Sequence, residues 1–439
     1  MPRVLQGCGE KRRVLVNELQ QGPFMSTTWN GWRDETRRLL RFLALRDRGN
    51  LGWLPSAAWD WWDFAQACDT HQVTPYVYCW LQGLTETDVP AGLLEHLRTR
   101  FQEVCACNYH LAKKVVDLVA MLENEGIPAL VYKGPALAMA VYGGLAFRHY
   151  NDLDLVIRKE HHAKALRVLT GWGFQIVPKP ALPRVRPYLG RPEDPRNVER
   201  TQEIEFCAPD STYYLDLHWQ LGDRFWRPFN PDVEKLWDRA EWQDLPQGRV
   251  STLCREDLFL ALCAHGNVHR WVCLKWLLDV AELLRKAGTL DWSRVEEMMK
   301  IRPGAAASAS VAAILAHDLL EVAVPPEIER ILPTTPRTRA LAKAVQEELL
   351  SKGQSSADEH TTLLALQARW VARMKYQAYR IIHYPDGLFR EIFVQVSPKD
   401  RALIRLPNRL QFLYHLIRPV RLVVKHCVRM ARTLWSTAI

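Results

Sequence analysis

The chain has 439 residues, of which 48% are hydrophobic and 24% are charged, and its formal net charge is +9. This composition is ordinary for a soluble globular protein of two or three domains. No apolar run reaches the roughly 18 residues that a membrane-spanning helix needs, and the charged N-terminal stretch contains no apolar signal core. The ten cysteines lack zinc-type spacing, so we expect reduced thiols and a cytoplasmic location.

Residues 1–24 show no periodic apolar pattern. Met25 follows them, directly before a Ser-Thr-Thr stretch of the kind that caps helices. We therefore expect residues 1–24 to be a disordered or loosely attached extension and Met25 to be the native start. Residues 25–125 are predicted to form an N-terminal helical region, because segments such as WRDETRRLLRFLAL carry apolar residues at three- and four-residue spacing.

The pattern changes to short alternating strands and helices over residues 126–250. IPALVY is a short β-rich run, and the KGPALAMAVYGG after it suits a turn that enters a helix. RHYNDLDLVI and FQIV read as the next strands, and TQEIEFCA and TYYLDLHWQL read as a hairpin. This stretch therefore predicts a small mixed α/β unit.

Helices return over residues 251–350, and a polar linker then leads to a basic helical region at residues 361–439. After Asp400 there is no acidic residue, but eight Lys or Arg alternate with apolar residues at loosely helical spacing. One interpretation is a terminal helix that packs on the body and keeps a solvated basic face. The alternatives are binding to an acidic partner, to a membrane surface or to nucleic acid.

Two acidic residues one position apart open the strand in RHYNDLDLVI. Asp152 and Asp154 point to one face of that strand, because side chains alternate with a period of two. Asp216 and His218 share a face of the strand in YYLDLHWQ, so all three carboxylates converge if the two strands are neighbours. Clustered carboxylates are stable only when protons or cations neutralise them. This pattern of oxygen ligands suits two Mg²⁺ or Mn²⁺ ions; the alternative is a pair of surface Asp at a strand end.

The segment KGPALAMAVYGGLAFRHYNDLDLVI resembles the active-site signature of the polymerase-β-like nucleotidyltransferase superfamily. That signature is a glycine turn at a helix start, a strand with Asp-x-Asp, and a third carboxylate on a later strand, where Asp216 fits. Over roughly residues 30–330 the chain most resembles the bacterial family of uncharacterised nucleotidyltransferases. The similarity lies in the Lys-Gly turn, the Arg before Asp-x-Asp, the Asp-Leu-His-Trp strand and the pattern HGNVHRWVCLKWLLDVAELL.

This resemblance implies an α+β fold in which a small mixed-sheet nucleotidyltransferase core is flanked by N- and C-terminal helical regions. It implies an enzyme that moves a nucleoside monophosphate from a nucleoside triphosphate, with ATP expected, to an acceptor hydroxyl and releases pyrophosphate. The acceptor would be a small molecule, a sugar, a peptide or a protein. Asp152 and Asp154 would hold both metal ions. Asp216 would ligate the ion nearest the acceptor and take the acceptor's proton, a contribution of roughly 10²–10⁴ in rate.

The residues around the glycine turn are the expected nucleotide ligands. Lys133 and Gly134 stand at this turn, where the superfamily has Gly-Gly or Gly-Ser but this chain has Gly-Pro. Pro135 removes a backbone donor, so Lys133 would compensate as a cation. Arg148 would bind phosphate or brace the Asp strand, and the alternative is a structural salt bridge. His218 would touch the acceptor or would serve as a structural histidine.

The helical residues 251–350 would close over the nucleotide, as helical domains of related nucleotidyltransferases do. Lys275 and Asp279 are four residues apart on one face of a helix, and His265 lies close to three helical turns before Lys275. We therefore expect Lys275 to reach the triphosphate, Asp279 to orient Lys275, and His265 to line the cleft. The alternative is an ordinary Lys–Asp surface pair.

Two other classes of function stay open. A non-catalytic nucleotide-binding or regulatory module would keep the fold without turnover, although the intact Asp residues argue against it. A terminal nucleotide-adding enzyme that acts on RNA would use the basic tail, although no RNA-binding module is recognisable. Salt-dependent binding to RNA would distinguish that class.

Overall fold

The computed structural model describes residues 32–45, 61–82, 90–177, 202–222, 229–324, 326–332 and 334–350. The chain divides into two compact units, and every described residue belongs to the unit that comprises Met1–Pro178 and Gly190–Ala368. The predicted extension at residues 1–24 and the basic region at residues 361–439 lie outside the described residues.

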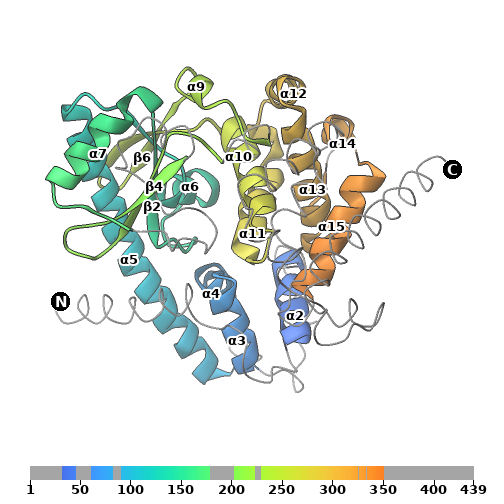
Figure 1. Cartoon of the computed structure of the whole chain (residues 1–439). Coiled ribbons are helices and arrows are strands. Elements are labelled where there is room, and N and C mark those ends of the chain that lie inside the picture. Colours follow the sequence, from blue (N-terminus) through green and yellow to red (C-terminus); the bar gives the residue numbers. More distant parts are fainter. Residues whose placement is uncertain are drawn as a thin grey trace, which may run out of the picture. The chain divides into compact units, whose positions relative to one another are not determined.

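The described residues form an α+β fold around one mixed sheet, as the sequence predicted (Figure 1). Its seven strands lie in the order β3-β4-β5-β2-β1-β7-β6. β2 runs antiparallel to β1 and parallel to β5, and β4 runs antiparallel to β5. β2, which carries Asp-x-Asp, is therefore an interior strand with backbone partners on both sides. The strand bounds are β1 Ala129–Val131, β2 Asp152–Ile157, β3 Gln175–Ile176, β4 Glu203–Cys207, β5 Tyr214–His218, β6 Glu241–Leu245 and β7 Gly248–Thr252.

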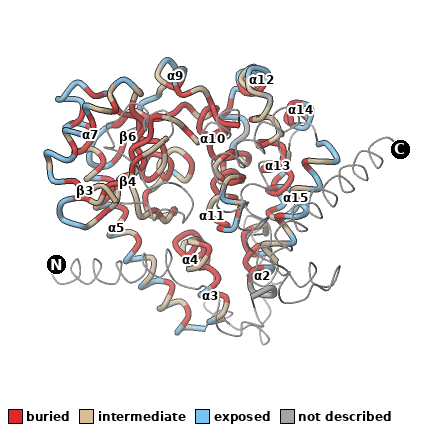
Figure 2. Tube along the Cα trace, in the orientation of Figure 1, coloured by how far each residue is buried: buried red, intermediate tan, exposed pale blue. Residues whose placement is uncertain are grey.

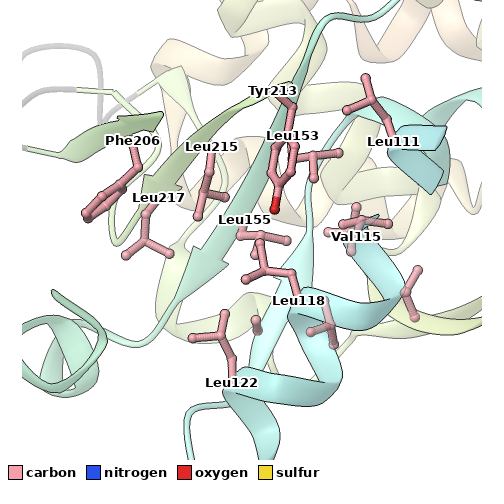
Figure 3. Close-up of a cluster of buried hydrophobic side chains, with 14 of the residues drawn as sticks. Leu111, Val115, Leu118, Leu122, Leu153, Leu155, Phe206, Tyr213, Leu215 and Leu217 are labelled. Atoms are coloured by element: carbon pink, nitrogen blue, oxygen red, sulfur yellow. The ribbon is translucent and has the colours of Figure 1, made fainter. Parts of the chain in front are cut away.

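One face of the sheet is covered by helices and is apolar. In the 34-residue helix α5, apolar side chains recur at three- and four-residue spacing and face the sheet (Figure 3). They meet leucines of β2 and β5 in one buried core, which α7 (His162–Gly171) extends. Ile204 and Phe206 of β4 point into the same core. The helices before the sheet are α2 Trp32–Leu45, α3 Trp61–Thr70, α4 Thr74–Leu81 and α5 Ala91–Asn124.

Between β1 and β2 the chain forms a short helix and a tight return. α6 (Gly134–Leu137) continues into the π-helical turn η2 (Ala138–Tyr142). The side chain of Asn108 in α5 donates a hydrogen bond to the carbonyl of Arg148 at 2.8 Å. The hydroxyl of Tyr150 donates to the Asn108 carbonyl at 3.0 Å. The segment directly before β2 is therefore held on α5, which determines where the strand begins.

The helices after the sheet pack around α13, which is rich in alanine and serine. α10, α11, α12 and α15 all contact α13, and so does the N-terminal helix α2. Figure 2 shows that α10, α11 and α13 are largely buried. Among the described helices, none is both long enough and apolar enough to cross a membrane. The bounds are α10 Arg255–Val268, α11 Leu274–Arg285, α12 Trp292–Ile301, α13 Pro303–Leu320, α14 Pro326–Ile331 and α15 Pro336–Leu349, with short turns η3 Lys159–His161, α9 Val233–Leu236 and η5 Ala287–Thr289.

Candidate active site

The acidic residues lie on the face of the sheet opposite the apolar core. In the parallel pair β2–β5, Asp154 lies directly beside Asp216, and Asp152 lies beside Tyr214. The leucines between these positions point into the core under α5 (Figure 3). Since side chains alternate along a strand, the carboxylates must point the other way. The two strands that the sequence proposed as neighbours are paired, and the pairing brings Asp154 and Asp216 together.

Three side chains on this face are close enough to share one cation. Asp154, Asp216 and His218 each offer a ligand atom, and these atoms lie within 4.8 Å of one another. Asp154 and His218 are buried, and Asp216 is half-buried. Asp152 is also half-buried but is not part of this close group. Two carboxylates and an imidazole are ligands that divalent metals accept. We call Asp154, Asp216 and His218 the acid group.

Lys133 joins the acid group from the turn between β1 and α6. Its Nζ atom lies 3.2 Å from Oδ1 of Asp154 and 4.5 Å from the centre of the Tyr132 ring. Burial opposes the charge of Lys133, but the attraction of Asp154 outweighs it and raises the pKa of Lys133 above its usual value. Gly134 follows with a φ of +54°, and a Cβ there would lie 3.6 Å from the Asp152 carbonyl. Glycine is favoured here because other residues adopt this backbone conformation at a cost.

His218 bridges two acids. Its Nε2 atom lies 3.2 Å from Oδ1 of Asp154, and its Nδ1 atom lies 3.1 Å from Oε2 of Glu203. Burial alone would lower the pKa of His218, but hydrogen bonds to Asp154 and Glu203 raise it to about 9. In the same way burial would raise the pKa of Asp154, but Lys133 and His218 together lower it. Asp154 is therefore a permanent carboxylate between two cations.

Asp216 is in the opposite situation. Burial raises its pKa, and the negative charge of Asp154 raises it further, to about 8. Without a metal, this carboxyl group therefore holds a proton near neutral pH, and a bound cation would displace that proton.

Glu203 and Glu205 are part of this face and were not predicted from the sequence. In the antiparallel pair β4–β5, Glu203 lies beside His218, and Glu205 lies beside Asp216. The signal was present in TQEIEFCA, where the two glutamates alternate with Ile204 and Phe206 of the core. The face therefore carries five carboxylates, whose charges Lys133 and His218 offset in part.

Arg148 and Asp279 form an ion pair with each other. The Arg148 guanidinium donates from Nε and Nη2 to the two carboxylate oxygens of Asp279 at 2.8 and 2.9 Å. The Tyr142 hydroxyl donates to the same carboxylate at 2.8 Å. Both members of the ion pair are buried. The prediction that Asp279 orients Lys275 therefore differs from the observed contact, because a guanidinium matches both carboxylate oxygens whereas an ammonium is a point charge.

Lys275 and His265 lie on helices α11 and α10. The Lys275 ammonium donates to the side-chain carbonyl of Gln72. Burial lowers the pKa of Lys275, Arg148 lowers it further, and Asp152 is one of the charges that oppose this shift. His265 is half-buried, and its ring contacts those of His269 and Trp276.

A family model described as an uncharacterised nucleotidyltransferase matches residues 57–321, which is more than half of the chain. The matched range contains the acid group, Lys133, the Arg148–Asp279 pair and the rings of His265, His269 and Trp276. Searches of the curated proteins and of the solved structures found no match.

Proposed function

The chain belongs to the uncharacterised nucleotidyltransferase family, and we propose that it moves a nucleoside monophosphate from a nucleoside triphosphate, ATP in the first instance, to an acceptor hydroxyl. The bond between the α- and β-phosphates breaks, a bond from the α-phosphorus to the acceptor oxygen forms, and pyrophosphate leaves. The observation that carries this proposal is the register of β2 and β5, which sets Asp154 beside Asp216 with His218 and Lys133 around them.

The acid group fits a divalent cation. Asp154 and Asp216 would hold one Mg²⁺ or Mn²⁺ ion, and Asp152 together with Asp154 would hold a second. His218 would join the first ion only after losing the proton that Asp154 and Glu203 favour. When bound, such ions neutralise charge on the phosphates and activate the attacking oxygen. The carboxylates supply the negative charge that binds them, and the pairing of β2 on both sides keeps these ligands in place without rearrangement.

Two groups act on the reacting atoms. Lys133 places a positive charge beside Asp154, where it would attract the phosphates, a task that Pro135 cannot perform through a backbone donor. Asp216 would take the proton of the acceptor hydroxyl as general base. Burial and Asp154 raise the pKa of Asp216 to about 8 in the metal-free protein, and a bound cation would lower this pKa, so that the carboxylate would be ionised when it accepts the proton.

Transfer of label from ATP tests the proposal. The full-length protein is incubated with Mg²⁺, a native cell extract and ATP that is labelled on either the α- or the γ-phosphate, and the labelled product is identified. Nucleotidyl transfer predicts that the acceptor acquires the α-label and that the γ-label leaves with pyrophosphate. Asp154→Asn serves as the inactive control. Label from the γ-phosphate on the acceptor would show a kinase instead, and no label in the acceptor from either nucleotide would favour a non-catalytic module.

A further inference from the structure

The pattern HGNVHRWVCLKW spans the end of α10 and the start of α11. The acid group lies on β2 and β5, so it does not account for the histidines and tryptophans of this pattern. Arg270 and Trp271 both have left-handed backbone conformations, with φ of 55° and 56°. Such conformations are costly for residues other than glycine, and they persist where the surrounding structure enforces them. The turn between the two helices is therefore strained, and contacts with neighbouring residues must stabilise its backbone conformation.

Trp271 and Gly266 hold this turn. The backbone N–H of Trp271 donates to the Gly266 carbonyl at 2.8 Å, and its indole N–H donates to the side chain of Asn267 at 3.2 Å. A side chain at Gly266 would overlap the Trp271 ring. Trp271 is fully buried. This packing turns the chain back at once, so α11 starts beside α10 (Figure 1).

The result is a group of three rings from two helices. His265 and His269 are four residues apart and share a face of the chain at the end of α10, with ring centres 4.5 Å apart. The Trp276 ring lies 4.9 Å from His269 at an interplanar angle of 35°, and 5.4 Å from His265. Unlike Trp271, these rings keep exposed surface: His269 is exposed, and His265 and Trp276 are half-buried. We call these three residues the ring group.

Helix α10, which carries His265, also reaches the acid group: the Tyr132 hydroxyl donates to the Ala261 carbonyl of α10 at 3.5 Å, and the Tyr132 ring lies 6.0 Å from the His218 ring. The charge of Lys133 acts on both His265 and His269, and the charge of Glu203 acts on His269. Lys275, the residue before Trp276, is acted on by Asp152. The charges of Lys133, Lys275 and Glu203 therefore act on the ring group, whose side chains keep exposed surface. A ligand that fits this combination carries an aromatic ring joined to a chain of phosphates.

We propose that the ring group binds the base of the nucleoside triphosphate, with the base stacked on Trp276 and His269. This rests on the proposed function and adds the surface that recognises the nucleoside. Stacking on aromatic side chains tolerates every base, because each base has a π-face. The strained turn at Arg270 and Trp271 then has a purpose, since it sets the rings of α10 against Trp276.

Comparison of ATP with inorganic tripolyphosphate tests this assignment, because the two share phosphates and differ in the nucleoside. Binding of each is measured by titration calorimetry with full-length protein and Mg²⁺. Wild type should bind ATP more tightly than tripolyphosphate. Trp276→Ala and His269→Ala should each weaken ATP binding by about 5- to 150-fold and leave tripolyphosphate binding unchanged, and Trp276→Phe should recover most of the loss. His269 is exposed, so His269→Ala keeps the test valid if Trp276→Ala unfolds.

Trp242→Ala is the matched control, since Trp242 is 57% exposed on the edge strand β6; it should alter neither affinity. Variants of the ring group that weaken both ligands equally, or neither, would overturn the assignment. Equal binding of ATP and tripolyphosphate by wild type would overturn it while leaving the phosphate and metal site intact. If folded wild type binds neither ligand, the proposed function is contradicted, and the assignment of the ring group is contradicted as well.

Discussion

Arg148 and Asp279 form a buried bidentate ion pair although they lie 131 residues apart in the chain. Arg148 belongs to the segment that leads into β2, and Asp279 belongs to α11. The pair therefore joins the strand that carries Asp-x-Asp to the helix that carries Lys275 and Trp276. The contact is a buried salt bridge, which was the predicted alternative to phosphate binding and to bracing of the Asp strand.

Replacing Arg148 should lower both stability and activity. Arg148→Met leaves the Asp279 carboxylate buried without its counter-charge, which typically costs about 3–5 kcal/mol of unfolding free energy. Urea unfolding measures this loss. Arg239→Met is the matched control, because Arg239 makes the same bidentate contact with the buried Asp257 at 2.7 and 2.8 Å. Both variants should lose similar stability, but at a temperature where both are folded only Arg148→Met should slow transfer. Equal rates in the two variants would contradict the coupling.

Two substitutions in the acid group should shift stability in opposite directions when metal is absent. At pH 9, where Asp216 is ionised, Asp216→Asn relieves repulsion with Asp154 and should raise the melting temperature in EDTA. Asp154→Asn leaves Lys133 and His218 without the carboxylate between them and should lower it. Both should abolish transfer. Thermal unfolding followed by circular dichroism would decide, and a gain in stability from Asp154→Asn would show that its pairing with Lys133 and His218 is not stabilising.

The metal-free protein should become less stable between pH 7 and pH 9. The fold raises the pKa of Asp216 to about 8 and that of His218 to about 9, so the folded state binds these protons more tightly than the unfolded state does. Stability from such groups is present at low pH and is lost as pH rises through the folded pKa. Urea unfolding in EDTA at several pH values measures the slope. His218→Gln should make the slope shallower. An unchanged slope in that variant would show that His218 does not contribute to the pH dependence of stability.

Lys275→Ala should weaken nucleotide binding more than it changes the apparent affinity for the acceptor. Lys275 is acted on by the charges of Asp152 and Arg148, which supports a place near the triphosphate. Lys286→Ala, at the residue that directly follows α11, is the control, because the Lys286 ammonium donates to the Val141 carbonyl at 2.6 Å. Steady-state kinetics with both substrates varied separates the two affinities. The same small effect in both variants would mean that Lys275 does not contact the nucleotide.

Local patterns in the sequence were sufficient for the α+β class, for the strands β1 to β5, and for the shared face of Asp152 and Asp154. These inferences depend on periodicity and on turn residues, which are local properties. The edge hairpin β6–β7 was not predicted, because EWQDL and GRVST are short and largely exposed and carry little apolar alternation.

Contacts between distant segments were harder to predict. Lys275 and Asp279 have the spacing of a helix pair, but Asp279 binds an arginine far away in the sequence. Nothing in the local pattern of α11 indicates that partner, since the choice depends on how the loop before β2 packs. The position of Glu203 and Glu205 could have been predicted from the sequence. They alternate with the core residues Ile204 and Phe206, so they point to the acidic face of the sheet once β4 is placed beside β5.

Metal binding tests the central claim most directly. Titration of Mn²⁺ into the full-length protein, followed by electron paramagnetic resonance in the presence of a non-hydrolysable ATP analogue, measures how many ions bind and how tightly. The acid group on β2 and β5 predicts that wild type binds Mn²⁺ and that Asp154→Asn and Asp216→Asn each lose most of this affinity. Asp117→Asn, which alters an exposed carboxylate of α5, should bind as wild type does. Equal Mn²⁺ affinity in all four folded proteins would contradict the assignment of these strands as the metal and nucleotide site.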